Sequence, residues 1–307
     1  MQPFGAVDGG RPRPCTNEDA MRPLFAAGGD GGSGAARRGR GGRRAPIALG
    51  ALALLLGGCA VTHAPAPSRR PAPRPTQPDP AARAAVLARA DALAASALRD
   101  PSAADALRRM LADAVGAADA EFAWSWRLAR AEFLCSRHAG DRAGQAAAAE
   151  RGVAWARQAL RREAQRVEGH YYLALCLGQL AEARSKLGLV KPMEAAAKQA
   201  AALDPRFDGA GPLVFLGKLY LSAPGWPLSI GDVERAVATL QRALALDPRP
   251  LTRLFLAQAL AEDEQRDAAA RELQQVLAAR HTLEPRWRAE AERLRLKLGL
   301  VIPAPAL

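Results

Sequence analysis

"LVFLGKLYLSAPGWPLSIGDVERAVATLQRALALDP" (213–248) is the stretch of sequence that decides the predicted fold. Apolar residues recur in it every three or four positions on both sides of a proline-containing loop, which predicts two helices. Gly217 lets a neighbouring helix approach closely, and Pro248 turns the chain out of the second helix. The residues that carry the pattern are Leu213, Leu216, Gly217, Tyr220, Ala236, Leu240 and Pro248. The stretch therefore predicts a pair of packed helices.

The same pattern recurs elsewhere in the chain, and "ALDP" closes both 202–205 and 245–248. Related frames are Trp126, Ala129 and Phe133 with Gly152, Ala156 and Ala159; Ala174, Leu177, Gly178 and Ala181 with Met193, Ala197 and Ala200; and Leu254, Ala257 and Ala261 with Ala269, Leu273 and Val276. This repetition resembles the tetratricopeptide repeat, a unit of two antiparallel helices. It predicts an all-α, tetratricopeptide-like α-solenoid over residues 81–299 and a C-terminal tail at 300–307. The first two helices are expected at about 81–99 and 102–118.

The loop in the middle of the deciding stretch is longer than the repeat requires. From Pro205 to Pro248 the unit spans 43 residues, against about 34 in the simple repeat. Most of the excess is "LSAPGWPLSIGD" (221–232), where prolines and a glycine bracket Trp226. We expect Trp226 to pack back onto the helices. The alternative is that it contacts a ligand or a partner, as residues on ordered loops often do.

The N-terminal part of the chain has the organisation of a secretory signal. "RRGRGGRR" (37–44) is followed by the uncharged "APIALGALALLL" (45–56), a basic region and then an apolar region. The apolar run is shorter than the ~20 residues of a membrane-spanning helix. The following Leu56, Gly57, Gly58 and Cys59 resemble a bacterial lipobox, which implies that Cys59 carries the lipid and begins the mature protein. The alternative to a signal is that these residues form an apolar helix that ends in Gly-Gly-Cys by chance.

This resemblance divides the N-terminal residues into two parts. Residues 1–58 form a disordered leader with the signal peptide, and the hypothesis that translation starts at Met21 would remove residues 1–20. Residues 59–80 are expected to be the lipidated Cys59 and a proline-rich tether, of which residues 63–80 would extend over roughly 50 Å. Ala60 follows the lipidated cysteine where retention in the inner membrane favours aspartate. We therefore expect a lipid anchor in the bacterial outer membrane, facing the periplasm, with the inner membrane as the alternative.

Charge and cysteine content exclude other classes of protein. The net charge is +12, but only five of the 43 basic residues are lysines, and both signs alternate along the predicted helices. This pattern is typical of solvated helix faces, so we expect no nucleic-acid partner. The four cysteines form no CxxC pair, and neither a metal nor a cofactor is predicted. Cys135 and Cys176 are expected to be buried, with a disulfide between them as the alternative.

The sequence offers no set of catalytic residues, and we predict that the protein is not an enzyme. The four histidines are widely separated, and neither HExxH nor a nucleophile elbow is present. His170, Tyr171 and Tyr172 form the best polar and aromatic cluster. Either they pack structurally on a helix face, or together with Trp226 they bind a ligand or a partner.

Three segments together carry a more specific resemblance: "WSWRLARAEF" (124–133), "VEGHYYLALCLGQLAE" (167–182) and "LGKLYLSAPGWPLSIGDVERA" (216–236). They resemble the T-component family of tripartite ATP-independent periplasmic transporters over roughly residues 80–280. That family is also distantly similar to eukaryotic regulators of microtubule dynamics. Tyr171 and Tyr172 stand where the family often has Tyr-Trp. The resemblance implies a lipid-anchored, all-helical protein, with a homo-oligomer among the arrangements that it allows.

Two functions follow from these patterns. The first is an interaction scaffold, in which stacked helix pairs form a groove for a partner protein. The alternative is a solute-binding accessory component of a periplasmic transporter that holds a small hydrophobic ligand. A groove lined by arginine, tyrosine and amide side chains favours the scaffold. A closed apolar cavity beside Trp226 and Tyr171 favours the solute.

Overall fold

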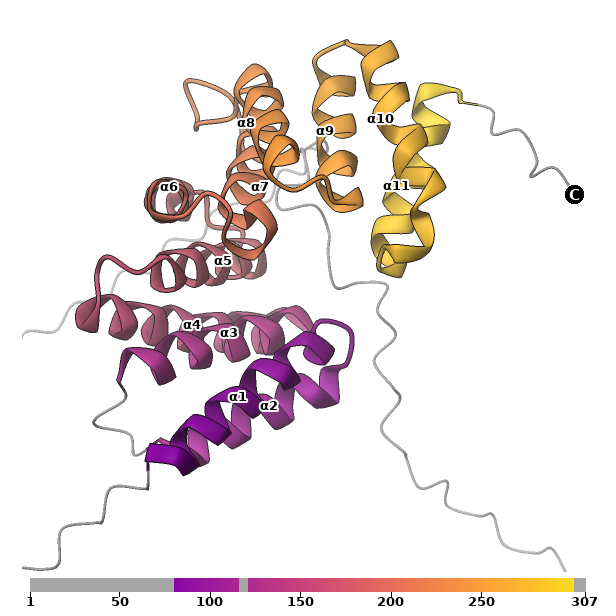
Figure 1. Cartoon of the computed structure of the whole chain (residues 1–307). Helices are drawn as coiled ribbons and strands as arrows, with labels where there is room; N and C mark the ends of the chain where they lie inside the picture. Colours follow the sequence, from indigo (N-terminus) through magenta and orange to yellow (C-terminus); the bar gives the residue numbers. More distant parts are fainter. Residues whose placement is uncertain (1–79, 116–120, 301–307) are drawn as a thin grey trace, which may run out of the picture. The chain divides into compact units, whose positions relative to one another are not determined.

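The computed structural model describes residues 80–115 and 121–300, and these residues are helical almost throughout (Figure 1). The α-helices are α1 Pro80–Ala97, α2 Pro101–Ala114, α3 Phe122–Arg137, α4 Arg142–Arg162, α5 Val167–Arg184, α6 Val190–Leu203, α7 Phe207–Ser222, α8 Val233–Leu246, α9 Pro250–Glu262, α10 Arg266–Ala278 and α11 Pro285–Leu298. Two short 3₁₀ helices are η1 Leu187–Leu189 and η2 Arg280–Thr282. The predicted leader, lipobox, tether and C-terminal tail lie outside the described residues, apart from Pro80 and Leu300.

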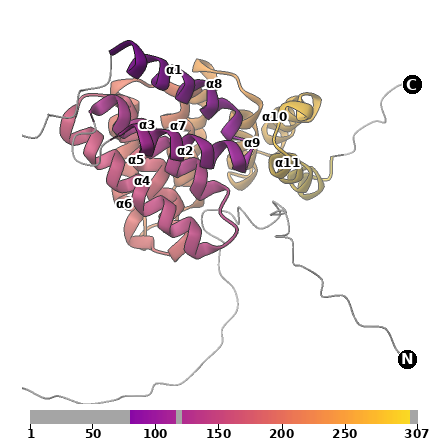
Figure 2. The same cartoon turned by 90° about the horizontal axis from the view of Figure 1, so that it is seen from below.

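Each helix packs against the next one along the chain, and the pairs follow one another from α1 to α11 (Figures 1 and 2). The pairs α3–α4, α5–α6, α7–α8 and α9–α10 coincide with the four frames of the sequence pattern. The predicted all-α solenoid of helix pairs is confirmed. In these described ranges no helix combines the length and the apolar character needed to cross a membrane.

Helix starts follow local capping chemistry. The carboxylates of Asp100, Asp141 and Asp232 accept backbone N–H groups at the first turns of α2, α4 and α8. Such a cap satisfies one of the donors that the first turn leaves free. The turn before Asp100 ends α1 at Ala97, earlier than predicted, and α2 ends at Ala114 in place of the predicted 118.

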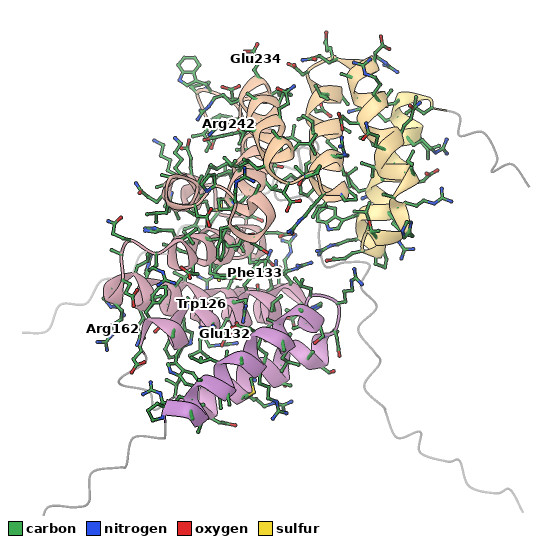
Figure 3. The ribbon with its side chains drawn as sticks, viewed as in Figure 1. Trp126, Glu132, Phe133, Arg162, Glu234 and Arg242 are labelled. Carbon is green, nitrogen blue, oxygen red and sulfur yellow. The ribbon has the colours of Figure 1, made fainter. Side chains whose placement is uncertain are left out.

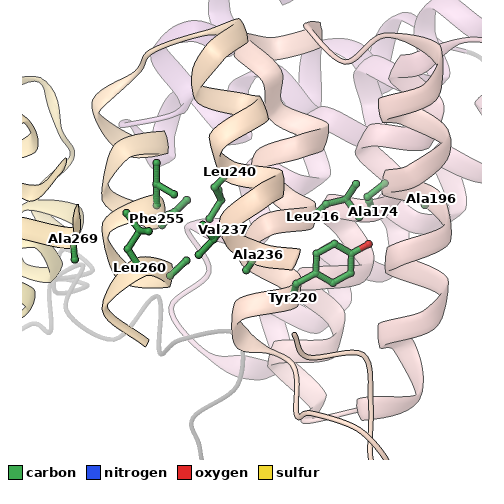
Figure 4. Close-up of a cluster of buried hydrophobic side chains, with 13 residues drawn as sticks. Ala174, Ala196, Leu216, Tyr220, Ala236, Val237, Leu240, Phe255, Leu260 and Ala269 are labelled. Carbon is green, nitrogen blue, oxygen red and sulfur yellow. The ribbon is translucent and has the colours of Figure 1, made fainter. Parts of the chain in front are cut away.

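The core consists largely of alanine and leucine, because the helices approach one another closely. At the repeat glycine, Gly217, a Cβ atom would lie 2.4 Å from Cγ of Leu240 on α8. The same holds at Gly152, where a Cβ atom would lie 2.5 Å from Sγ of Cys176. A cluster shared by α5 to α10 contains Ala174, Leu216, Tyr220, Ala236, Leu240, Phe255, Leu260 and Ala269 (Figure 4). The glycines therefore set the spacing of the helices, as the sequence pattern predicts.

Candidate partner-binding site

Tyr171 and His170, two of the residues singled out by sequence, make contacts within the fold. The Tyr171 side chain is buried, and its hydroxyl donates to Oδ2 of Asp208 at 2.9 Å. Its ring meets Phe207 edge to face with centroids 5.4 Å apart. Burial raises the pKa of Tyr171. Nε2 of His170 lies 2.9 Å from the carbonyl oxygen of Ala164, next to the start of α5. Tyr171 thus joins α5 to the first turn of α7.

Tyr172 is buried on another side of α5 and stacks on Trp126 of α3, with ring centroids 5.9 Å apart. Arg127 and Arg130 lie over the same indole at 4.2 and 4.9 Å, and each guanidinium also contacts a carboxylate oxygen of Asp91 at 2.6 Å. Figure 3 shows Trp126 on α3. Tyr172 therefore belongs to a packed layer that ties α1, α3 and α5 together.

The expectation that Trp226 packs back onto the helices is wrong, because the side chain is 88% exposed. The loop closes on its own backbone instead: Gly231 N–H donates to the carbonyl of Pro224 at 2.8 Å, and Leu228 N–H donates to that of Gly225 at 3.0 Å. Ile230 provides the apolar contact with the core. Trp226 is therefore ordered by its loop but not covered, and it does not meet the buried Tyr171 and Tyr172.

The structure assembles a different group of side chains, which we call the inner cluster. It combines three cations, two carboxylates, one amide and three aromatic rings. Its members are Phe133 and Arg137 of α3, Lys218 of α7, Phe255 and Gln258 of α9, and Glu284, Arg286, Trp287 and Glu290 at and within the start of α11. Sequence reasoning did not single these residues out as a site. One signal was available: Lys218 and Gln258 each follow the small residue of a repeat, Gly217 and Ala257.

One half of the inner cluster joins α7, α9 and α11. Nζ of Lys218 lies 5.1 Å from the Phe255 ring centroid and donates to Oε1 of Gln258 at 3.2 Å. Nε2 of Gln258 in turn donates to Oε1 of Glu290 at 2.7 Å. Burial lowers the pKa of Lys218, and the charge of Glu290 opposes that shift. The ammonium is therefore held by one amide, one ring and one nearby carboxylate.

The other half joins α3 to α11, which lie far apart in sequence. Glu284 Oε2 contacts Nη2 of Arg137 at 3.1 Å, across 147 residues, and Nη2 of Arg286 at 2.7 Å. Arg286 lies 4.8 Å from the Trp287 ring centroid, and Trp287 meets Phe255 edge to face at 5.1 Å. The two halves are thus continuous through these rings.

Two donors of the inner cluster have no protein partner in the described part of the chain. The Nε atoms of Arg137 and Arg286 are buried and have no hydrogen-bond acceptor within reach. Burial lowers the pKa of Arg137, while Glu284 raises it. An unpartnered buried donor is costly. The cluster therefore contains hydrogen-bonding capacity that the fold itself does not use.

A pocket of about 580 Å³ opens beside the inner cluster. Its lining residues are Ala95, Ser96, Leu98 and Arg99 at the end of α1, and Leu251, Thr282, Leu283, Glu284 and Trp287 on the opposite side. Most of the lining is apolar, and Arg99 and Glu284 supply opposite charges. Its volume lies within the range of about 300–1,000 Å³ that ligand pockets occupy.

The thiols of the described residues show no sign of reactivity. Cys135 and Cys176 are free, and burial raises the pKa of both, to about 11 for Cys135. They are therefore protonated at neutral pH and poorly nucleophilic. Within 80–115 and 121–300, no group of three His, Cys, Asp or Glu side chains could hold a metal ion.

Fold and repeat packing define a helical-repeat protein of the tetratricopeptide type. Residues 86–209, from α1 to the kinked start of α7, match the family described as "RMD1-3: Regulator of microtubule dynamics protein 1-3". A solved structure with this fold is TTC0263, a thermophilic TPR protein in Thermus thermophilus. It is 18% identical, covers 69% of this chain and 98% of its own, and superposes with a TM-score of 0.53. The curated proteins contain no match. The similarity to the T-component family stays a prediction.

Proposed function

We propose that this protein is a lipid-anchored periplasmic scaffold that binds a partner protein at the inner cluster and the adjoining pocket. The lipobox-like Leu56, Gly57 and Gly58 before Cys59 support the anchor, and Ala60 supports the outer membrane. The helical repeat domain supports the scaffold, because stacked helix pairs present extended binding surfaces.

The observation that carries the proposal is the composition of the inner cluster. It places cations, carboxylates and an amide from four helices beside aromatic rings, and two of its members, Glu284 and Trp287, also line the adjoining pocket. Arginine and aromatic residues are the types enriched at the energetic centres of protein interfaces. A peptide segment can supply carboxylates and backbone carbonyls to Arg99, the exposed cation of the adjoining pocket.

A small hydrophobic solute is the second candidate, and the pocket is the observation that favours it. Its volume of about 580 Å³ and its lining of Leu98, Leu251, Leu283 and Trp287 suit a small apolar ligand. The resemblance to the T-component family points in the same direction. The pocket is lined by neither Tyr171 nor Trp226, however, so it is not the closed cavity that was expected beside those two residues. The scaffold is therefore the function that we favour.

Site-specific photo-crosslinking in cells tests the partner site. A benzoylphenylalanine residue at Ser96, in the exposed pocket lining, is expected to capture a defined partner, while the same probe at Arg242 on α8 captures none (Figure 3). Arg99→Glu, which reverses a charge of the lining, is expected to abolish the crosslink. Arg242→Glu is the matched control. Equal capture from both probe positions would contradict the proposed site. Native mass spectrometry that finds a bound small molecule in place of a protein would favour the hydrophobic solute.

The anchor is tested separately. Mass spectrometry of the mature N-terminal peptide is expected to find an acylated Cys59. Cys59→Ala is expected to lower the share of the protein that stays with the outer-membrane fraction after a high-salt wash. An unmodified Cys59 in membrane-associated protein would refute the lipid anchor without affecting the partner site.

A further inference from the structure

Two loops lie at the same end of the α6–α7 pair. One is the turn between α5 and α6, which contains η1, and the other is the loop between α7 and α8. Leu189 of the first and Ile230 of the second pack against the same buried cluster, which includes Val190 and Ala223. The two loops therefore lie at one end of the domain, which we call the loop face.

The loop face presents large apolar side chains to solvent. Trp226 is 88% exposed, Leu228 81% and Leu187 50%. The residues from 223 to 231 carry no charge. Other exposed large apolar residues among those described lie apart, at Leu98 on the α1–α2 turn and at Leu296 on α11. The loop face is thus where exposed apolar surface is concentrated.

Backbone hydrogen bonds hold the apolar tip of this face in place. The carbonyl of Gly225 accepts from Leu228 and Ser229 at 3.0 and 3.1 Å, and Asp232 N–H donates to the carbonyl of Tyr220 at 3.0 Å. At Gly231 a Cβ atom would lie 2.0 Å from the carbonyl oxygen of Ala223, so no larger residue fits. An ordered loop loses little conformational entropy on binding. The backbone that carries the exposed side chains is therefore preorganised for contact.

The loop face carries two exposed lysines. Lys186 and Lys191 flank η1, both are exposed, and neither has an ion pair in the described part of the chain. Among the nearby acids, Glu194 is held by Lys198 at 2.6 Å and Asp232 caps α8. Glu234, in the first turn of α8, is the exposed acid beside the face (Figure 3).

The size of the apolar patch separates two classes of occupant. A stable protein interface buries about 1,200–2,000 Å² in total. The three exposed side chains, of which the aromatic one contributes about 150–250 Å², cover only part of the roughly 800 Å² that one partner supplies. A bilayer surface needs no such area, because a tryptophan and a leucine reach the acyl boundary while lysines meet anionic headgroups. The patch therefore fits a lipid surface better than a second protein.

We propose that the loop face docks on a phospholipid membrane, with Trp226 and Leu228 in the headgroup and acyl boundary and with Lys186 and Lys191 against anionic lipid. This inference rests on the proposed lipid anchor, which keeps the domain near one bilayer surface. The predicted tether, with its expected length of roughly 50 Å, is compatible with an approach of the domain to that surface.

Vesicle binding by the chain without its lipid tests the proposal. The probe is a vesicle of phosphatidylethanolamine and phosphatidylglycerol, and the protein is the mature chain, residues 59–307, with Cys59→Ala. Every contact described above lies within residues 80–300, which this chain retains. We expect sedimentation with the vesicles and a blue shift of tryptophan fluorescence that Trp226→Phe removes, because Trp226 is the exposed tryptophan of the described residues.

Three variants decide the outcome. Trp226→Ser with Leu228→Ser is expected to lower vesicle affinity at least tenfold, and circular dichroism checks that the fold is retained. Leu296→Ser, at a side chain 65% exposed on α11, is the matched control and is expected to change nothing. Lys186→Glu with Lys191→Glu is expected to weaken binding to anionic vesicles several-fold and to reduce its dependence on salt.

Several results would overturn the membrane assignment. Unchanged vesicle affinity of the Trp226 and Leu228 double variant is one, and an absent fluorescence shift is another. Loss of self-association in that variant without loss of vesicle binding would assign the face to a second copy of the chain. The mass of the mature N-terminal peptide reports on the anchor independently, so failure of the anchor is distinguishable from failure of the docking face.

Discussion

The close contact at the repeat glycine makes Gly217→Ala a direct test of the packing of α7 on α8. The new methyl group would lie 2.4 Å from Cγ and 2.8 Å from Cδ2 of Leu240. Leu240 is fully buried in the cluster of Figure 4 and cannot turn into solvent. The two helices must therefore move apart or the leucine must leave its preferred rotamer.

The expected cost follows from two opposing effects. Overpacking of a well-packed core costs about 1–3 kcal/mol. Replacing glycine by alanine within a helix returns up to about 1 kcal/mol. We therefore expect Gly217→Ala to lower the free energy of unfolding by about 1–2 kcal/mol. Gly188→Ala is the matched control, because a Cβ atom there would meet nothing within 4 Å, and we expect it to be neutral or slightly stabilising.

Urea unfolding followed by far-UV circular dichroism measures both variants. A double-mutant cycle with Leu240→Ala makes the test specific, since that change alone should cost about 2–5 kcal/mol. Because the methyl group of the new alanine would occupy part of the space that the leucine leaves, the double variant should be less destabilised than the sum. Equal stability of Gly217→Ala and Gly188→Ala, or strict additivity in the cycle, would refute the close contact.

Three further predictions concern polar groups. Burial raises the pKa of Glu182 from 4.5 to about 7. The stability that is present below pH 4.5 is therefore lost as the pH rises through 7. The free energy of unfolding of Glu182→Gln should match that of the wild type at pH 5 and exceed it at pH 8 by roughly 1–2 kcal/mol. Tyr171→Phe removes the 2.9 Å hydrogen bond to Asp208 and should cost about 1–3 kcal/mol, measured by urea unfolding. Arg137→Met leaves Glu284 short of one partner and should cost about 2–4 kcal/mol, with faster hydrogen exchange at the start of α11.

Controls for these variants come from exposed groups. Lys297→Met breaks an exposed pair with Glu262 at 2.6 Å and should cost less than about 1 kcal/mol. A cost equal to that of Arg137→Met would contradict the buried character of the α3–α11 contact. A stability difference between Glu182→Gln and the wild type that does not change with pH would contradict the titration of Glu182.

Several features of the fold were predictable because they depend on spacing along one helix. Gly152, Gly217 and Leu240 stand at the repeat positions, and each lies at a helix contact as predicted. Helix starts were partly predictable from Asp and Pro residues. The kink at the start of α7, where Asp208, Gly209 and Ala210 adopt positive φ, was not predicted. Asp208 there meets Tyr171 from another repeat, a contact that no local pattern encodes.

The candidate site was less predictable than the fold. Tyr171 and Tyr172 looked like binding residues because aromatic and polar groups adjoin in the sequence. Their surroundings are set by Phe207 and Trp126, which come from different helices. The exposure of Trp226 also depended on tertiary structure, since the loop satisfies its own backbone and Ile230 takes the core position.

The sequence by itself determined the helical repeats, their pairing and the lipobox-like segment that ends at Cys59, because these depend on short-range periodicity and on neighbouring residues. Only the tertiary structure decided which side chains form the inner cluster. Arg137 and Glu284 meet across 147 residues, and their contact depends on the summed rotation of all the repeats between them. Packing at every helix contact contributes to this total rotation, so no single segment of the sequence predicts the contact.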